Sequence, residues 1–198
     1  MSTISTLASV FLADTQKRLS ELVVPPQMDE AVLAVLACKG KIITTGMGKA
    51  GHAARKAASS MCSLAFPAVY LDPGDAAHGD VGVVRPEDIM LAFSTSGKTR
   101  EVQESIKFSK SLGISKVITI TSHPDGEIRE VSDIVLDMGD VEEVGHLGLA
   151  PTTSICIMLV ISDMLCLTAA ELKGVTQEDY GKRHHGGYLG KKCRGETR

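Results

Sequence analysis

Hydroxyl-bearing residues gather in the stretch AFSTSGKTRE, residues 92–101. Its SGKT segment matches the end of the ATP-binding P-loop, but that loop requires a glycine at the position of Ala92, so the match is incomplete. The hydroxyls of Ser94, Ser96 and Thr99, together with nearby backbone amides, suit a single compact phosphate dianion. Simple N-capping of a following helix explains Ser96 or Thr99 equally well when either residue is taken alone.

A second glycine-rich turn, GMGKAG at residues 46–51, matches the dinucleotide fingerprint GxGxxG. Asp72 follows it about where a ribose-binding acid would lie, so an NAD enzyme is one hypothesis. The alternative is that Gly46 and Gly48 only permit a tight turn and that Asp72 begins the turn DPGD. Because a dinucleotide would not need a second hydroxyl cradle, the two loops together favour a monophosphate.

Three further side chains could supply proton-transfer chemistry: Lys49, His78 in DAAHGDVG and Glu143 in VEEVGHLGLAPT. A carboxylate can move a proton between adjacent carbons while a cation and an imidazole polarise oxygens and open a sugar ring. Such chemistry needs no metal or organic cofactor. Each residue also has a plainer explanation: His78 as a solvated loop residue, Glu143 as part of a solvated acidic stretch, and Glu101 as a favourable charge at a helix N-terminus.

Short β-branched runs alternate with segments of helical periodicity, which predicts repeated βα units around a parallel sheet. We expect strands at residues 41–45, 68–71, 88–93, 116–121 and 133–137. We expect helices at about 4–22, 28–38, 49–64, 99–113 and 125–131, and one opened by Pro151. The predicted fold is a three-layer α-β-α, doubly wound α/β domain with strand order 2-1-3-4-5, in which both glycine loops line the crevice between strands 1 and 3.

Composition places limits on the function. The chain has 198 residues, 43% hydrophobic, and a formal net charge of -3, which suits one globular domain and gives no electrostatic reason to expect nucleic acid. No signal peptide is recognisable, and the apolar segment 151–172 carries Asp163, so a buried helix fits it better than a membrane span. Five cysteines without a CxxC pair suit the cytoplasm. His184 and His185 lack partners at zinc spacing, so no metal site is expected.

Five motifs occur in order along the chain: TTGMGKAGHAARK, HGDVG, FSTSGKTREV, GLAPTTS and HHGGYLG. In this combination the sequence resembles the sugar-isomerase (SIS) domain family, and within it the arabinose 5-phosphate isomerases, from about residue 30 to 192. The resemblance implies a single SIS domain over 1–198, with N-terminal helices at 1–39, an α/β core at 40–175 and an active-site tail at 176–198.

Carried over residue by residue, the resemblance implies a phosphate site made by Ser94, Thr95, Ser96 and Thr99, with Gly48 and Lys49 closing over the substrate.

The resemblance also implies catalytic roles. Glu143 matches the family glutamate that shuttles the proton, and His184 matches a histidine that reaches the active site from a neighbouring subunit and assists ring opening. His78 and Glu101 match further active-site positions. The resemblance also implies a homotetramer.

The reaction implied is isomerisation of D-arabinose 5-phosphate and D-ribulose 5-phosphate through a cis-enediol. It would supply 3-deoxy-D-manno-octulosonate for lipopolysaccharide or capsule. Many relatives continue into CBS domains whereas this sequence ends soon after GGYLGKKCRG, so we expect any feedback ligand from that pathway to act at the sugar site.

The sequence departs from the family pattern at Lys98, usually Glu, and at His146 and His185, where Pro is common. These departures bear on the substrate more than on the reaction class. Two alternatives stay open. One is an isomerase of a hexulose or heptulose phosphate, and the other is a non-catalytic sugar-phosphate sensor, which would need the cradle but not Glu143 or His184.

Overall fold

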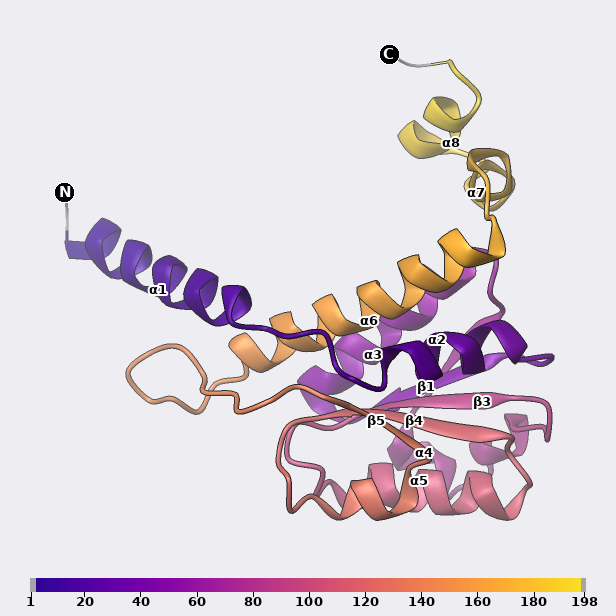
Figure 1. Ribbon diagram of the computed structural model, residues 1–198, viewed down its shortest axis with the longest axis horizontal. Helices are drawn as coiled ribbons and strands as arrows, with labels where there is room; N and C mark the ends of the chain where they lie inside the picture. Colours follow the sequence, from indigo (N-terminus) through magenta and orange to yellow (C-terminus); the bar gives the residue numbers. More distant parts are fainter. Residues whose placement is uncertain (1–2, 197–198) are drawn as a thin grey trace.

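Five parallel strands form the middle layer of the molecule, and helices cover both faces (Figure 1). The computed structural model describes residues 3–196. The strands are β1 (Ile42–Gly46), β2 (Ala68–Leu71), β3 (Ile89–Phe93), β4 (Lys116–Thr121) and β5 (Ile134–Asp137). They pair in the order β2-β1-β3-β4-β5, so the predicted doubly wound α/β topology is confirmed.

The helices divide between the two faces of the sheet. One face carries α2 (Met28–Ala37), α3 (Gly48–Ser63) and α6 (Thr153–Lys173), and the other carries α4 (Pro73–Ala76), α5 (Arg100–Ser111) and the 3-10 helices η1 (Asp80–Val83) and η2 (Glu127–Val131). The first helix, α1 (Thr3–Ser20), and the last two, α7 (Gln177–Arg183) and α8 (Gly187–Cys193), project from this body as two arms (Figure 1).

Two apolar cores lie on opposite sides of the sheet because successive strand side chains point to opposite faces. Ile42 and Phe93 belong to the core beneath α2, α3 and α6. Ile43 and Met90 belong to the second core, which α5 completes with Ile106. Burial on both faces explains why the strand sequences are continuous apolar runs rather than alternating ones.

Some boundaries differ from the predicted ones. Of the helix predicted at 125–131, only Glu127–Val131 is helical, and it is the 3-10 helix η2. α6 begins at Thr153, two residues after Pro151. The tail contains two short helices that the sequence analysis does not predict, although Thr176 and Asp179 form a capping box at the start of α7. The division of the chain at residues 39 and 175 stays a prediction.

Within residues 3–196, α6 is the one helix long and apolar enough to cross a membrane. It packs against α3 and α2 and buries Ile161, Ser162 and Leu165 near its middle. This burial is typical of the core helix of a globular domain.

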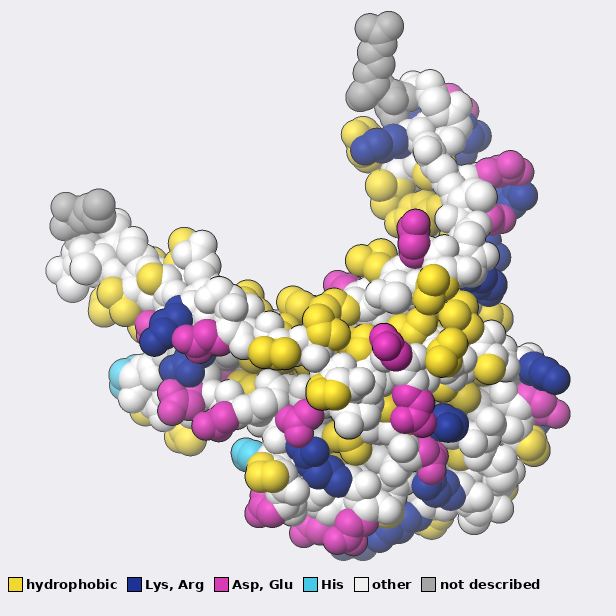
Figure 2. All heavy atoms as spheres, viewed as in Figure 1, with side chains coloured by type: hydrophobic (Ala, Val, Ile, Leu, Met, Phe, Trp, Pro, Cys, Tyr) yellow, Lys and Arg dark blue, Asp and Glu magenta, His cyan; other side chains and the backbone are white. Residues whose placement is uncertain are grey.

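The space between the two arms is lined by exposed apolar side chains, which are the yellow areas over α6 and α2 in Figure 2. Leu167 and Leu172 of α6 are 60% and 65% exposed. No described residue of α1 is buried, and Leu7 and Phe11 lie open to solvent. Exposed apolar surface of this extent indicates an interaction surface.

At the amino-terminal edge of the sheet, Asp88 ties β3 to β1. Its side chain is 2% exposed and accepts hydrogen bonds from the Lys41 amide (2.8 Å), the Lys41 ammonium (2.5 Å) and the Arg85 amide (2.8 Å). Burial opposes ionisation of Asp88, but these donors outweigh it, and the pKa of the carboxyl lies below its ordinary value.

We predict that Asp88→Asn lowers the free energy of unfolding at pH 7 by about 1–3 kcal/mol, since the Lys41 ammonium and the two amides lose a charged acceptor that is buried. A carboxyl whose pKa falls on folding stabilises the protein above its unfolded pKa of about 3.9 and loses that contribution on further acidification. The difference in the free energy of unfolding between wild type and variant should therefore become smaller below about pH 4. Urea denaturation at constant protein concentration measures it. A gap of equal size at pH 7 and pH 3 would contradict this account.

Candidate functional site

The two glycine loops follow adjoining strands. β1 pairs with β3 in parallel, and Gly46 at the end of β1 lies opposite Phe93 at the end of β3. The chain then enters α3 on one face of the sheet and α5 on the other. Both helix N-termini therefore open toward the same crevice at the carboxyl edge, as the sequence predicts.

The glycine turn after β1 brings the backbone of α3 close to the strand end. Gly48 has φ 59°, and a Cβ at Gly51 would lie 2.5 Å from the carbonyl oxygen of Gly46. Met47, the N-cap residue of α3, supplies no side-chain hydrogen bond to the helix. The first-turn amides of α3, which include that of Lys49, are thus left for an external acceptor.

The loop after β3 is folded around its own hydroxyl groups. Ser94 is 2% exposed, its Oγ lies 3.1 Å from Thr99 Oγ1, and it accepts a hydrogen bond from the amide of Gly97. The Lys98 amide donates to Ser96 Oγ at 3.2 Å. Thr99 occupies the N-cap position of α5 without capping it, so N-capping does not account for this residue.

Contacts with the β4–η2 segment hold this loop in place. Gly97 has φ 67°, and a Cβ there would lie 2.9 Å from Gly126 Cα. The carbonyl of Thr95 accepts from the Ser122 amide at 3.0 Å. Lys98, one of the departures from the family pattern, forms an ion pair with Asp125 at 2.7 Å. This ion pair links the two loops at the solvent-exposed surface.

Asp72 is committed to contacts within the protein. One carboxylate oxygen accepts from the Gly74 amide at the start of α4 (3.0 Å), and the other accepts from Arg55 (3.1 Å). A ribose-binding acid would need to accept from the ribose 2′-hydroxyl. These contacts account for Asp72 without NAD. DPGD is the capped start of the short helix α4 rather than the predicted turn.

Glu143 approaches the N-terminus of α6. Its Oε2 accepts from the Thr152 amide (2.7 Å), the Thr152 hydroxyl (3.0 Å) and the Ser154 amide (3.2 Å). Partial burial opposes ionisation, but the donors of Ser154 and Thr152 outweigh it, and the pKa of Glu143 lies below its ordinary value. Its neighbour Glu142 is solvent-exposed and pairs instead with Arg18. Glu143 is therefore an oriented carboxylate rather than part of a solvated acidic run.

The structure places the other predicted residues at two ends of the molecule. Lys49 and Glu101 lie exposed in the first turns of α3 and α5, on either side of the crevice. His78 is exposed just after α4, which packs against α5. These residues share the carboxyl edge of the sheet with the hydroxyl loop.

His184 lies at the opposite edge. Its ring stacks on Tyr180 at 4.0 Å between centroids, Nδ1 lies 3.0 Å from the Tyr180 carbonyl, and Nε2 lies 3.4 Å from Ser63 Oγ at the end of α3. The 16 residues of α3 span about 24 Å, so His184 and Gly48 are separated by the length of this helix within one chain. A role for His184 in this site requires a second chain.

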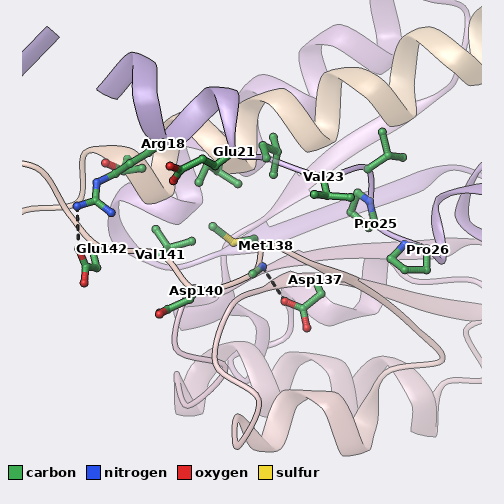
Figure 3. A pocket seen from close by; sticks show the side chains of 15 residues that line it. Arg18, Glu21, Val23, Pro25, Pro26, Asp137, Met138, Asp140, Val141 and Glu142 are labelled. Atoms are coloured by element: carbon green, nitrogen blue, oxygen red, sulfur yellow. Dashed lines mark hydrogen bonds and ion pairs between the residues drawn. The ribbon is translucent and has the colours of Figure 1, made fainter. Parts of the chain in front are cut away.

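A pocket of about 260 Å³ lies near the carboxyl edge, between the end of α1 and the β5–α6 loop (Figure 3). Glu21, Asp137, Asp140 and Glu142 contribute carboxylates to its wall, and Arg18 is paired with one of them. An excess of negative charge disfavours a phosphate ester here. The uncapped helix N-termini, rather than this pocket, form the candidate anion site.

Comparison with known proteins identifies the family of this chain. Residues 35–168 match the family described as SIS domain. The chain belongs to the SIS domain family. This span includes the hydroxyl loop and Glu143 but not His184.

Individual relatives are also similar. Arabinose 5-phosphate isomerase KdsD of Escherichia coli O157:H7 is 41% identical over 155 residues, which cover 78% of this chain and 47% of that protein. The chain thus spans about half the length of the curated relatives it matches.

Among solved structures, a Bacteroides fragilis protein assigned as a phosphosugar isomerase involved in capsule formation is 38% identical, with TM-score 0.88, over 94% of this chain and all of that one. The Escherichia coli CFT073 protein c3406, solved in complex with arabinose 5-phosphate, is 28% identical, with TM-score 0.86, over 93% of this chain and all of that one.

Sequence reasoning did not identify Tyr70 and Gln103. The Tyr70 hydroxyl donates to the Gly46 carbonyl at 2.7 Å, and Gln103 donates to the Gly97 carbonyl at 3.0 Å. Each fixes a carbonyl in one of the two glycine loops. A tyrosine in a strand and a glutamine in a helix carry no local signal for such contacts, which only the folded chain brings together.

We predict that Thr152→Val raises the pKa of Glu143, because the variant loses a hydroxyl donor while keeping the amide donor. Carbon-detected NMR titration of the glutamate carboxyl groups should show a higher midpoint for Glu143 alone. Thr99→Val, which changes a hydroxyl outside this cluster, should leave that midpoint unchanged. An unaltered Glu143 titration in Thr152→Val would show that the hydroxyl does not stabilise the ionised form.

Proposed function

We propose that this protein is an aldose–ketose isomerase that interconverts D-arabinose 5-phosphate and D-ribulose 5-phosphate. The observation that carries the proposal is the convergence of two uncapped helix N-termini on one crevice. Their amides and the hydroxyls of the STSGKT loop suit a phosphate dianion. A partly buried, oriented carboxylate lies on the same edge of the sheet, and the relative named arabinose 5-phosphate isomerase supports the choice of sugar.

In this proposal the phosphate is held by Ser94, Thr95, Ser96 and Thr99, with Gly48 and the α3 amides closing the other side. The hydroxyls face an anion that both helix dipoles favour.

The proton is moved by Glu143. Its three donors all bind Oε2, and no described residue is seen to donate to Oε1, so that oxygen is left for the substrate. Glu143 takes the proton from C2 of the aldose, the electron pair forms the C1–C2 double bond of a cis-enediol, and O1 gains a proton. Return of a proton to C1 with loss of the O2 proton gives the ketose. The low pKa of Glu143 keeps it ionised at neutral pH.

Lys49, His78 and Glu101 lie around the crevice, where they can polarise the sugar oxygens or relay their protons. His184 serves a second copy of the chain in this proposal, because a helix length separates it from its own crevice. The exposed apolar residues of α1 and α6 favour assembly with further copies of the chain. The proposed assembly is the homotetramer that the family resemblance implies.

The wider setting is also proposed. In this proposal the product supplies 3-deoxy-D-manno-octulosonate for lipopolysaccharide or capsule, in the cytoplasm. The similar structure whose description includes capsule formation supports the capsule part of this setting. A product of that pathway would inhibit by binding the same sugar site. A hexulose or heptulose phosphate is the alternative substrate, since the same cradle and base would serve it. A non-catalytic sensor is disfavoured by the three donors that orient Glu143.

We predict that wild type exchanges the C2 proton of arabinose 5-phosphate in heavy water while forming ribulose 5-phosphate, as proton NMR would record. Glu143→Gln should abolish this exchange, because an amide is not a base, and should leave substrate affinity within a few-fold. Undiminished exchange in that variant would remove Glu143 from its role.

The matched control is Ser96→Ala, which removes a proposed phosphate donor but no base. It should weaken substrate binding by about 1–3 kcal/mol in calorimetry while exchange at saturating substrate persists. If exchange is absent with arabinose 5-phosphate but present with a hexulose or heptulose phosphate, the reaction class stands and the substrate changes.

We also predict complementation between chains. Glu143→Gln and His184→Ala should each be nearly inactive alone, whereas mixed oligomers made by joint refolding should recover activity, since some crevices receive an intact Glu143 from one chain and an intact His184 from another. Measurement of isomerase rate against mixing ratio tests this. Recovery no greater than the sum of the two parent activities would contradict the proposed exchange of His184 between chains.

A further inference from the structure

Three side chains outside the phosphate cradle form a continuous set of contacts on the β2 edge of the sheet. Tyr70 ends in a hydroxyl that donates to the Gly46 carbonyl at 2.7 Å. The guanidinium carbon of Arg55 lies 3.6 Å from the centre of the Tyr70 ring. Arg55 in turn forms an ion pair with Asp72 at 3.1 Å. A cation over an aromatic face and an ion pair fix the position of the ring.

At one end of this set, Tyr70 contacts the turn that carries Lys49. Gly46 is buried, and an unpaired carbonyl at the end of β1 would be costly, so the Tyr70 hydroxyl holds the turn in one conformation. The fit is close, because a Cβ at Gly51 would lie 3.0 Å from that hydroxyl. Gly51 and Arg55 are four residues apart and therefore lie on the same face of α3. Tyr70 therefore lies along the face of α3 that carries Gly51 and Arg55.

At the other end of this set, Asp72 contacts the segment that leads to His78. Asp72 is the N-cap of α4, whose four residues lead directly to that segment, and it accepts from the Gly74 amide at 3.0 Å. The Ser105 hydroxyl of α5 donates to the Glu101 carbonyl at 2.8 Å and also lies 3.5 Å from the carbonyl oxygen of Pro73. A displacement of Asp72 would thus change the position of α4 and, through Arg55, the conformation of the glycine turn.

We propose that Tyr70, Arg55 and Asp72 are positioning residues that couple the Lys49 turn to the His78 segment, so that both sides of the sugar site adopt their working geometry together. The proposal rests on the proposed isomerase function for its catalytic consequence, but the coupling itself is a property of the fold. None of the three residues touches the phosphate cradle in this arrangement. Their effect on the reaction passes through the backbone of the two segments.

Stability alone is a poor explanation for these contacts. Arg55 and Asp72 are 54% and 39% exposed, and an ion pair this open to solvent contributes little to the free energy of unfolding. A positional role predicts a different signature, in which global stability changes slightly while the geometry of two separate segments changes together. The test must therefore read out both segments independently of activity.

The experiment compares Tyr70→Phe and Asp72→Asn with wild type by backbone amide NMR and by steady-state kinetics with arabinose 5-phosphate. Tyr70→Phe keeps the ring beneath Arg55 and loses only the hydroxyl. Asp72→Asn keeps an acceptor for the Gly74 amide and loses the charge that holds Arg55. We expect each variant to shift the amide signals of both 47–50 and 74–79, and to lower kcat about tenfold or more while KM changes less, because misplaced groups slow the reaction.

The matched control is Asp133→Asn. Asp133 also binds a lysine, Lys110 at 3.1 Å, and a backbone amide, that of Val117 at 2.7 Å, with an exposure of 38%. It lies at the amino-terminal edge of the sheet, before β5. This variant should leave kcat and the amide signals of 47–50 and 74–79 unchanged.

Amide shifts confined to 47–50 in Tyr70→Phe and to 74–79 in Asp72→Asn would overturn the proposal, as would kcat values equal to wild type. Arg55→Lys provides a third variant: it keeps the charge but not the flat group over the ring, and should shift both segments as well. If wild type isomerises no sugar phosphate, the proposed function fails, while the amide signals still decide whether the two segments are coupled.

Discussion

The site depends on the parallel pairing of β1 with β3, which places Gly46 opposite Phe93 and sends the following helices to opposite faces of the sheet. Two helix N-termini then meet over one short stretch of sheet edge. Each has partial positive charge and unpaired amide donors, and their proximity is unfavourable unless an anion or water lies between them. The absence of side chains at Gly46 and Gly51 permits the close approach of β1 to β3 and of α3 to the end of β1.

Capping differs among the helix N-termini: α2 and α8 lack a side-chain cap, as α3 and α5 do, but only α3 and α5 open toward the crevice. α4 and α7 are capped by Asp72 and Thr176, and α6 receives the carboxylate of Glu143. α3 and α5 have no such side-chain cap. Three donors hold one carboxylate oxygen of Glu143 at the start of α6, and no described residue is seen to donate to the other. The same interactions that lower its pKa also fix its direction.

The sequence predicts most of the fold because the strands are compact β-branched runs and the two glycine loops have the residues that their turns demand. It also predicts the hydroxyl cradle, whose members are close in the chain. It does not predict the contacts of Tyr70 with Gly46 or of Arg55 with Asp72, since these depend on the packing of β2 against α3. The sequence also does not predict the position of His184 at the far end of α3. That position depends on the tail helices α7 and α8, which are too short and too rich in glycine to show a helical periodicity.

The most direct test of the central claim is a titration of the protein with inorganic phosphate, followed through the backbone amide signals of residues 47–50 and 96–101. If one dianion lies between the two helix N-termini, both sets of signals should shift along a single binding curve with one phosphate per crevice. Shifts limited to one loop, or two curves with different affinities, would mean that the loops do not form one site.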